Sequence, residues 1–242
     1  MKHTKTNFGK SKVSLNKKTP LVQKIFTDVT KNYDLMNDLM SLGTHRIWKK
    51  SFVELINVQK KDEIIEVGSG TGDILKYLKN LDISLTAIDL NSKMLNEAKK
   101  KYNIYKNIKW INCNAEVMPF KDNSFDKYII TFCLRNVTYI DKVLNEAQRI
   151  LKPGGIFYCL EFSKPQSSFV NKFYSLYKEK IIPIMGEKIG KNRKAYEYLG
   201  ESIEMFPNQD TLLFKLKKIG FVNTSVINLF NGIVAIHIGY KL

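Results

Sequence analysis

The chain has few of the residues that build metal sites or disulfide frameworks. Its 242 residues include three cysteines and three histidines. Cys113, Cys133 and Cys159 each stand in an apolar segment that is typical of a strand, without Cys-x-x-Cys spacing. We therefore expect neither a disulfide framework nor a zinc site, and no other metal. Buried, reduced thiols indicate a reducing compartment.

Long apolar runs are also missing, and we expect no leader segment. The longest apolar runs, 181–185 and 233–238, are far shorter than the roughly 20 residues that span a bilayer. Residues 1–20 carry six lysines and no acid, but they lack arginine and the apolar core of a signal peptide. We interpret 1–20 as a basic, mobile tail, 21–242 as a single domain and the cytoplasm as the compartment.

Acidic residues are scarce relative to basic ones. Lys and Arg total 39 against 23 Asp and Glu, which gives a formal charge of +16. Such a charge attracts polyanions, which include nucleic acid, an anionic membrane surface and acidic substrates. Lysines scattered over helix faces give the same excess without any partner. The sequence is therefore consistent with two alternatives, which are peripheral contact with the inner face of a membrane and a protein free in solution.

Strand and helix patterns alternate from residue 63 onward. Strands are predicted at 63–67, 84–89, 109–113, 125–132 and 156–162, with helices at 72–79, 92–102 and 140–151. Strands joined by helices form right-handed crossovers and a mainly parallel sheet. Asn231-Gly232 separates two β-branched runs, which predicts a final hairpin. We expect an α/β, doubly wound, Rossmann-like fold with seven strands, mainly parallel, and an antiparallel C-terminal hairpin strand.

Two segments lie outside this alternation. Apolar residues at helical spacing over 21–60 predict an N-terminal helical cap. The aromatic, lysine-rich stretch 163–206 predicts an insertion that covers one end of the sheet and the substrate. Within it Phe169, Phe173, Leu176 and Tyr177 share one helical face, which is most often a core-facing stripe. A substrate lid or a membrane-surface helix is the alternative.

A glycine-rich loop joins the strand at 63–67 to the next helix. It reads Glu66-Val67-Gly68-Ser69-Gly70-Thr71-Gly72. No Lys follows Gly72, so a phosphate-binding loop is excluded. A dinucleotide loop is not favoured, because the third glycine comes one residue early for Gly-x-Gly-x-x-Gly. The loop resembles the first motif of the class I S-adenosylmethionine-dependent methyltransferases, which bind the amino-acid end of that cofactor there.

Polar residues at the ends of the following strands support this resemblance. Asp89 ends the second strand, where a carboxylate can accept both ribose hydroxyls of a nucleoside. Asn114 and Ala115 follow the third strand, where the class binds adenine, and Thr131 ends the fourth beside the methyl donor. Ligands of open α/β sheets bind at these carboxyl ends.

Longer stretches resemble the ubiquinone/menaquinone biosynthesis C-methyltransferase family, which methylates a ring carbon of a polyprenylated quinol. The matching residues lie at 31–41, 43, 45–49, 114–116, 118–120, 134–138, 151–155, 161–165, 198–199, 201–203, 232–237 and 239–241. The resemblance implies S-adenosylmethionine as the cofactor. It implies 2-methoxy-6-polyprenyl-1,4-benzoquinol, demethylmenaquinol or both as the substrate. Cys133 stands where the family often has a smaller residue, which predicts a narrower pocket.

The motifs and this resemblance together yield a set of site residues. The expected cofactor-binding residues are Glu66, Gly68, Gly70, Thr71, Gly72, Asp89, Asn114, Ala115 and Thr131. A phenolic ring must be made nucleophilic, and Arg135 is the candidate that stabilises its developing oxyanion, with a structural ion pair as the alternative. Tyr33, Asp34 and His45 are expected to activate or orient the hydroxyl, with capping or packing as their alternatives.

Two rival functions are consistent with parts of the sequence. An RNA methyltransferase would explain the positive charge, but the aromatic insertion and the lack of an appended RNA-binding module favour a small apolar substrate over nucleic acid. A non-catalytic assembly scaffold would not need the intact glycines and Asp89. A homodimer and a quinone-biosynthesis complex stay open as assemblies.

Overall fold

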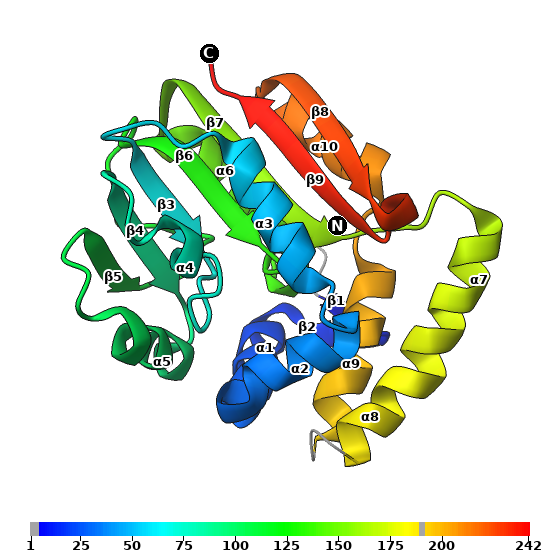
Figure 1. The fold of residues 1–242 in the computed structure, drawn as a ribbon. Helices are drawn as coiled ribbons and strands as arrows, with labels where there is room; N and C mark the ends of the chain where they lie inside the picture. The colour runs from blue at the N-terminus through cyan, green and yellow to red at the C-terminus, as the bar shows by residue number, and fades with distance from the viewer. Residues whose placement is uncertain (1–4, 189–191) are drawn as a thin grey trace.

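A twisted seven-stranded sheet forms the centre of the protein in a computed structural model that describes residues 5–188 and 192–242 (Figure 1). Its strands are β3 (Glu63–Val67), β4 (Ser84–Asp89), β5 (Ile108–Asn112), β6 (Phe125–Thr131), β7 (Leu151–Phe162), β8 (Val222–Leu229) and β9 (Val234–Tyr240). The order is β5-β4-β3-β6-β7-β9-β8, and β9 runs antiparallel to both β7 and β8. The other pairs are parallel. The predicted fold class is confirmed.

Alternation of apolar residues along the central strands explains why both faces of the sheet are covered. In β6, Ile129 belongs to one buried cluster and Tyr128 and Ile130 to the other. The first cluster includes α3 (His45–Ile56) and α4 (Leu75–Leu78), and the second includes α6 (Ile140–Ile150) and α10 (Gln209–Ile219). Because successive strand residues point to opposite faces, this pattern requires helices on both sides.

The N-terminal segment is ordered, so the prediction of a mobile tail is wrong over residues 5–20. Residues 1–4 lie outside the described part. β1 (Lys5–Phe8) and β2 (Ser11–Ser14) form a hairpin that leads directly into α1 (Leu15–Val29). The Phe8 ring stacks on Tyr198 with ring centroids 4.7 Å apart. The sequence pattern missed this hairpin because its strands are short and lysine-rich. Long-range contacts fix it, among them the Phe8–Tyr198 stack and the hydrogen bond from the Lys10 N–H to Glu201 Oε2 at 3.1 Å.

The predicted helical cap over 21–60 consists of α1, α2 (Tyr33–Ser41) and α3. The segment 163–206 contains α7 (Ser168–Leu176), the π-helical turn η3 (Tyr177–Ile181), α8 (Ile182–Lys188) and α9 (Arg193–Met205). Within the described residues no helix is long and apolar enough to cross a membrane.

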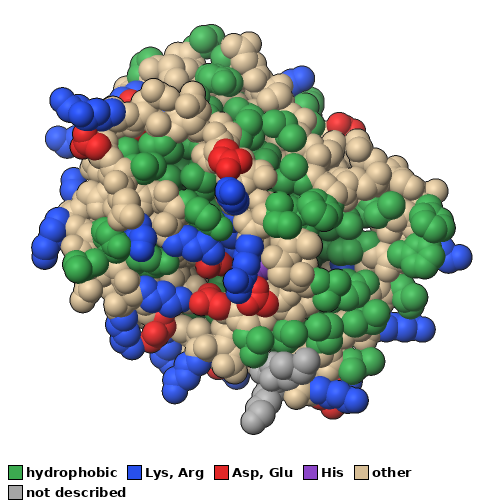
Figure 2. Space-filling view, viewed as in Figure 1, with side chains coloured by type: hydrophobic (Ala, Val, Ile, Leu, Met, Phe, Trp, Pro, Cys, Tyr) green, Lys and Arg blue, Asp and Glu red, His purple; other side chains and the backbone are tan. Residues whose placement is uncertain are grey.

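The expected core-facing stripe of α7 is wrong for three of its four residues. Phe169, Phe173 and Leu176 are 70%, 58% and 48% exposed, and apolar side chains gather over the right-hand side of the molecule in Figure 2. Only Tyr177 packs inward, where its hydroxyl donates to the Leu39 carbonyl at 3.0 Å. Helical periodicity identified one shared face but not the direction in which it points.

Candidate functional site

The glycine loop after β3 requires glycine for both conformation and space. Gly68, Gly70 and Gly72 have φ of 70°, 55° and 86°, a region that other residues rarely adopt. A Cβ on Gly68 would lie 2.3 Å from Sγ of Cys133, which stands two residues beyond the end of β6. Cys133 therefore packs against the loop itself, and the narrower pocket stays a prediction. The predicted helix at 72–79 shortens to α4, because the turns of the loop extend to Ile74.

Asp89 links the glycine loop to the end of β4. Its Oδ2 accepts from the Gly70 N–H at 2.9 Å, and its Oδ1 accepts from the Asn91 N–H at 2.7 Å. Burial raises the pKa of Asp89 to about 6, although the two backbone donors oppose the shift. Each carboxylate oxygen can accept a second hydrogen bond. The carboxylate therefore keeps capacity for two hydroxyl donors of a ligand.

These residues line a pocket that encloses about 760 Å³, part of it open to solvent. Its wall includes six of the predicted cofactor residues: Gly68, Gly70, Asp89, Asn114, Ala115 and Thr131. The buried Thr131 hydroxyl has no hydrogen-bond partner among the described residues. Buried polar atoms are nearly always paired. A polar ligand in this pocket would satisfy Thr131.

The helix α1 closes one side of the pocket. Thr19, Val22, Gln23 and Phe26 line it. The Asn91 side chain caps α5 (Ser92–Tyr102) through its oxygen, and its amide donates to the Gln23 carbonyl at 3.1 Å. One asparagine therefore fixes α1 to the turn that follows Asp89. Thr19 lies in the segment that we predicted to be a tail, whereas Val22, Gln23 and Phe26 lie in the predicted helical cap.

Three predicted cofactor residues lie behind the described pocket wall. Thr71 donates its hydroxyl to Asp34 Oδ1 at 2.9 Å. Gly72 packs against the Tyr102 ring. Glu66 is 2% exposed, and burial raises its pKa well above the usual range. Their positions support the loop, and the structure does not bring them to the ligand space.

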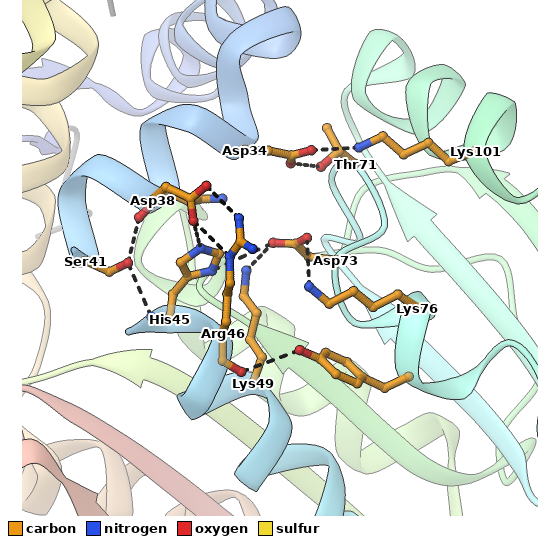
Figure 3. A network of polar contacts seen from close by, with 12 residues as sticks. Asp34, Asp38, Ser41, His45, Arg46, Lys49, Thr71, Asp73, Lys76 and Lys101 are labelled. Carbon is orange, nitrogen blue, oxygen red and sulfur yellow. Dashed lines mark hydrogen bonds and ion pairs between the residues drawn. The ribbon is translucent and has the colours of Figure 1, made fainter. Parts of the chain in front are cut away.

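Asp34 and His45 also lie outside the pocket, in a polar network between α2, α3 and the glycine loop (Figure 3). Besides Thr71, Asp34 pairs with Lys101 at 2.9 Å. His45 Nε2 lies 2.9 Å from Asp38 Oδ1. Burial, with help from Lys49, lowers the pKa of His45. The structure therefore places neither Asp34 nor His45 in the pocket wall, and their expected action on a substrate hydroxyl stays a prediction.

Lys49 and Asp73 form the buried part of the same network. The Lys49 ammonium contacts the Asp73 carboxylate directly, and Lys76 lies 3.7 Å from the other carboxylate oxygen (Figure 3). The Lys49 side chain is 5% exposed. Burial opposes the charge of Asp73, but Lys49 outweighs it and lowers the Asp73 pKa. The pair fixes α3 to the residue that directly follows Gly72.

Arg135 lies in the short turn Leu134–Asn136 beyond β6 and forms the ion pair that was its alternative interpretation, whereas its role toward an oxyanion stays a prediction. Its Nη1 donates to Glu161 Oε1 at 2.7 Å and to the Phe132 carbonyl at 2.6 Å. Burial would lower the pKa of Arg135, but the Glu161 carboxylate outweighs it and raises the pKa. The buried Nε finds no acceptor among the described residues. The ion pair therefore holds a guanidinium whose Nε is left without an acceptor in the part of the chain that the structure describes.

Three tyrosines are close enough to Arg135 for its charge to affect their pKa values. They are Tyr33, Tyr174 and Tyr198. Burial raises the pKa of each, and the Arg135 charge opposes the rise. Tyr33 also lines the pocket beside Gly70. Sequence patterns missed Tyr174, Tyr198 and the role of Glu161, because distant segments bring them together.

A second pocket begins beside Arg135. It encloses about 970 Å³, much of it open to solvent, and Arg135, Tyr198 and the β1–β2 hairpin contribute to its wall. Val137 lines both pockets, so they adjoin. Lys18 Nζ donates to the Val137 carbonyl at 2.7 Å, which fixes α1 to this junction. Arg135 and Tyr33 thus lie near the boundary between a cofactor-sized pocket and a second cavity.

Comparison with known proteins agrees with this geometry. A model of the ubiE/COQ5 methyltransferase family matches residues 12–241. The ubiquinone/menaquinone biosynthesis C-methyltransferase UbiE of Rickettsia felis is 50% identical over 246 residues, which cover 98% of this chain and 99% of that protein. The protein of the same name from Rickettsia prowazekii is also 50% identical, with the same coverage.

Solved structures show the same fold at low identity. A methyltransferase from Thermotoga maritima, described as a possible histamine N-methyltransferase, has a TM-score of 0.67 and 20% identity, and the match covers 91% of this chain and 100% of that one. Phosphoethanolamine N-methyltransferase 2 of Haemonchus contortus, solved with S-adenosyl-L-methionine, has a TM-score of 0.60 and 15% identity over 80% of this chain and 52% of that one.

The sheet order, the glycine loop and Asp89 define a class I S-adenosylmethionine-dependent methyltransferase. The chain belongs to the ubiE/COQ5 methyltransferase family. Its cofactor is S-adenosylmethionine, and the residues of the first pocket fit that molecule. Asp89 offers acceptors for two ribose hydroxyls, and the unpaired Thr131 hydroxyl needs a polar partner.

Proposed function

We propose that this protein methylates a ring carbon of a polyprenylated quinol, either 2-methoxy-6-polyprenyl-1,4-benzoquinol or demethylmenaquinol. The observation that carries the proposal is the 50% identity over nearly the whole chain to proteins named ubiquinone/menaquinone biosynthesis C-methyltransferase. The match extends over the N-terminal helices and the 163–206 segment, which surround Arg135. The similarity thus includes the part of the chain that would select a substrate.

Arg135 supplies the chemistry that a phenolic ring needs. S-adenosylmethionine carries a methyl group on a sulfonium that is already activated, so the protein must align that methyl with a carbon and make the carbon nucleophilic. Electron density reaches the ortho carbon when the phenol gives its proton to solvent water. After the methyl group has moved from sulfur to that carbon, the carbon releases its own proton to water and the ring is aromatic again. The unused Arg135 Nε can donate to the resulting oxyanion in a buried site, where such a donor is strongest.

Glu161 and Tyr33 complete the proposed site in different ways. Glu161 holds the guanidinium through Nη1 and accepts the backbone N–H groups of Arg135 and Phe162 as well. Arg135 therefore cannot rotate away from the junction of the two pockets. Because burial raises the pKa of Tyr33, its hydroxyl stays protonated at neutral pH and acts as a donor rather than a base.

The second pocket is the proposed place of the quinol ring, since it adjoins the cofactor pocket at Val137 and Arg135 lines it. A polyprenyl chain on that ring favours peripheral contact with a membrane, where such substrates are dissolved. A homodimer and a complex with other quinone-biosynthesis enzymes remain proposals that the family membership makes reasonable.

A double variant tests the role of Arg135 without leaving a buried charge unpaired. Arg135→Met with Glu161→Gln removes both charges, whereas Arg135→Ala alone would strand Glu161 and destabilise the fold by about 3–5 kcal/mol. We expect the double variant to bind S-adenosylmethionine in calorimetry with unchanged affinity. Its kcat for demethylmenaquinol should fall about 100-fold or more.

Arg135→Lys is the matched control, because it keeps the charge but lacks a guanidinium Nε. We expect it to lose most of the rate as well. Near-normal turnover in the double variant would contradict the electrostatic role. Absence of transfer from the wild-type protein to either quinol, with the cofactor bound, would contradict the proposed substrate class.

A further inference from the structure

We infer that the outward face of α7, η3 and α8 is a docking surface for an anionic lipid bilayer. We define this apolar face by Phe169, Phe173, Leu176, Ile181 and Ile184, which are 70%, 58%, 48%, 44% and 49% exposed. Figure 2 shows apolar side chains gathered on this side of the molecule. Single exposed apolar residues are ordinary, but several adjacent ones on one helical segment mark a binding surface.

The π-helical turn keeps this face continuous. Phe169, Phe173 and Leu176 repeat at the spacing of one α-helical face. An uninterrupted α-helix would place Lys180 next on that face. The π turn Tyr177–Ile181 adds one residue to the register, so Ile181 follows Leu176 instead. Ile184 then extends the face along α8.

Charge complementarity selects an anionic bilayer as the partner. Lys172, Lys180 and Lys188 are exposed on the same segment. Of its two acids, Glu187 is already paired with Arg193 at 2.7 Å. The chain as a whole carries a formal charge of +16, to which these lysines contribute. Apolar side chains flanked by lysines insert into the headgroup boundary, and the cations are attracted to anionic lipids.

The same helix connects this face to the site. On the inner side of α7, Tyr174 lies near enough to Arg135 and Glu161 for both charges to affect its pKa, which burial raises. At the start of α7, the Ser167 N–H donates to the Asn231 side chain at 2.9 Å, and the neighbouring Phe230 is 51% exposed. A bilayer on the outer face would thus lie one helix away from Arg135.

This inference rests on the proposed function, because docking to a membrane serves the enzyme only if its substrate is a polyprenylated quinol held there. The physical claim concerns the surface alone. Vesicle binding can therefore be measured on the full chain without quinol and without cofactor. Vesicle binding therefore tests the docking surface, and methyl transfer to a quinol tests the proposed substrate, so either proposal can fail without the other.

The test is co-sedimentation with phosphatidylcholine vesicles, with and without one quarter of phosphatidylglycerol. The wild-type protein is expected to bind the anionic vesicles and to dissociate as salt is raised. Phe169→Ser with Phe173→Ser should weaken this binding about tenfold or more. Phe214→Ser is the matched control, because Phe214 is 66% exposed on α10, outside this face. It should bind as the wild type does.

Equal vesicle binding by the double variant and the wild type would overturn the inference, and so would a wild-type protein that binds neither kind of vesicle. Sedimentation equilibrium tests whether a second copy of this chain, rather than a bilayer, covers the face. If the wild type formed a dimer that the double variant did not, and the dimer ignored vesicles, the face would be a contact between copies. Methylation of a quinol with a short, water-soluble side chain should be unchanged in the double variant.

Discussion

Asp89 shows how one buried carboxylate prepares the cofactor pocket. Each of its oxygens accepts a hydrogen bond from a backbone N–H, and one of these N–H groups belongs to the glycine loop. The same side chain therefore shapes the loop and offers acceptors to a ribose. Burial disfavours the charged form of this carboxylate and raises the pKa of Asp89 to about 6.

We predict that S-adenosylmethionine affinity depends on the ionisation of Asp89. The raised pKa means that the folded protein takes up a proton here as pH falls from 7 to 5, and a protonated carboxyl loses an acceptor. The dissociation constant measured by calorimetry should rise about tenfold between pH 7 and pH 5. Asp89→Asn should bind weakly at both pH values, with the pH dependence lost.

Asp82→Asn is the control for this experiment, because that side chain is 68% exposed in the loop before β4. It should behave as the wild type. If Asp89→Asn retained both the affinity and its pH dependence, Asp89 would not be the acceptor that we describe.

At this scale the sequence identified residues whose position follows from chain order. Gly68, Asp89, Asn114 and Thr131 stand at the ends of successive strands, and parallel topology alone brings such ends to one edge. Glu161 could not be found in the same way. Its importance arises from contact with Arg135, 26 residues away along the chain, and no local pattern encodes that pairing.

At the scale of elements, the polar network of Figure 3 joins the N-terminal helices to the glycine loop. Lys49 on α3 and Asp73 after Gly72 form its most buried contact. The helices α2 and α3 therefore do more than cover the sheet, because they fix the conformation of the loop that binds the cofactor.

We predict that Lys49→Met destabilises the protein, while its neighbour Lys50→Met does not. Removing Lys49 leaves the partly buried Asp73 carboxylate short of its main partner, which should cost about 2 kcal/mol in the free energy of unfolding. Lys50 is 71% exposed and lies 4.0 Å from Glu54, so its loss should cost under about 0.5 kcal/mol. Urea denaturation measures both, and equal stability of the two variants would count against the network.

Strand positions were largely predictable at this scale, whereas the N-terminal hairpin and the orientation of α7 were not. Central strands follow from continuous apolar runs that must be buried on both faces. The hairpin depends on Phe8 meeting Tyr198, and the direction of the α7 face depends on where α8 and α9 pack. Both features are set by tertiary contacts, which a local sequence pattern does not encode.

At the scale of the whole molecule, three distant segments converge on one edge of the sheet. The helices α1 and α2, the turn around Arg135 and the α7–α9 segment meet where the two pockets adjoin. We propose that the cofactor occupies the first pocket, on the sheet side, and the quinol ring the second, beyond Arg135. The exposed face of α7 and α8 lies outside both pockets, so the proposed cofactor, ring and membrane sites occupy successive positions.

Transfer of a labelled methyl group tests this account most directly. The full protein is incubated with S-adenosylmethionine labelled with carbon-13 in its methyl group and with 2-methoxy-6-polyprenyl-1,4-benzoquinol or demethylmenaquinol. The product is then examined by NMR and mass spectrometry. We predict one added methyl group bonded to a ring carbon. A methyl group bonded to oxygen, or no labelled quinone from either substrate, would contradict the account.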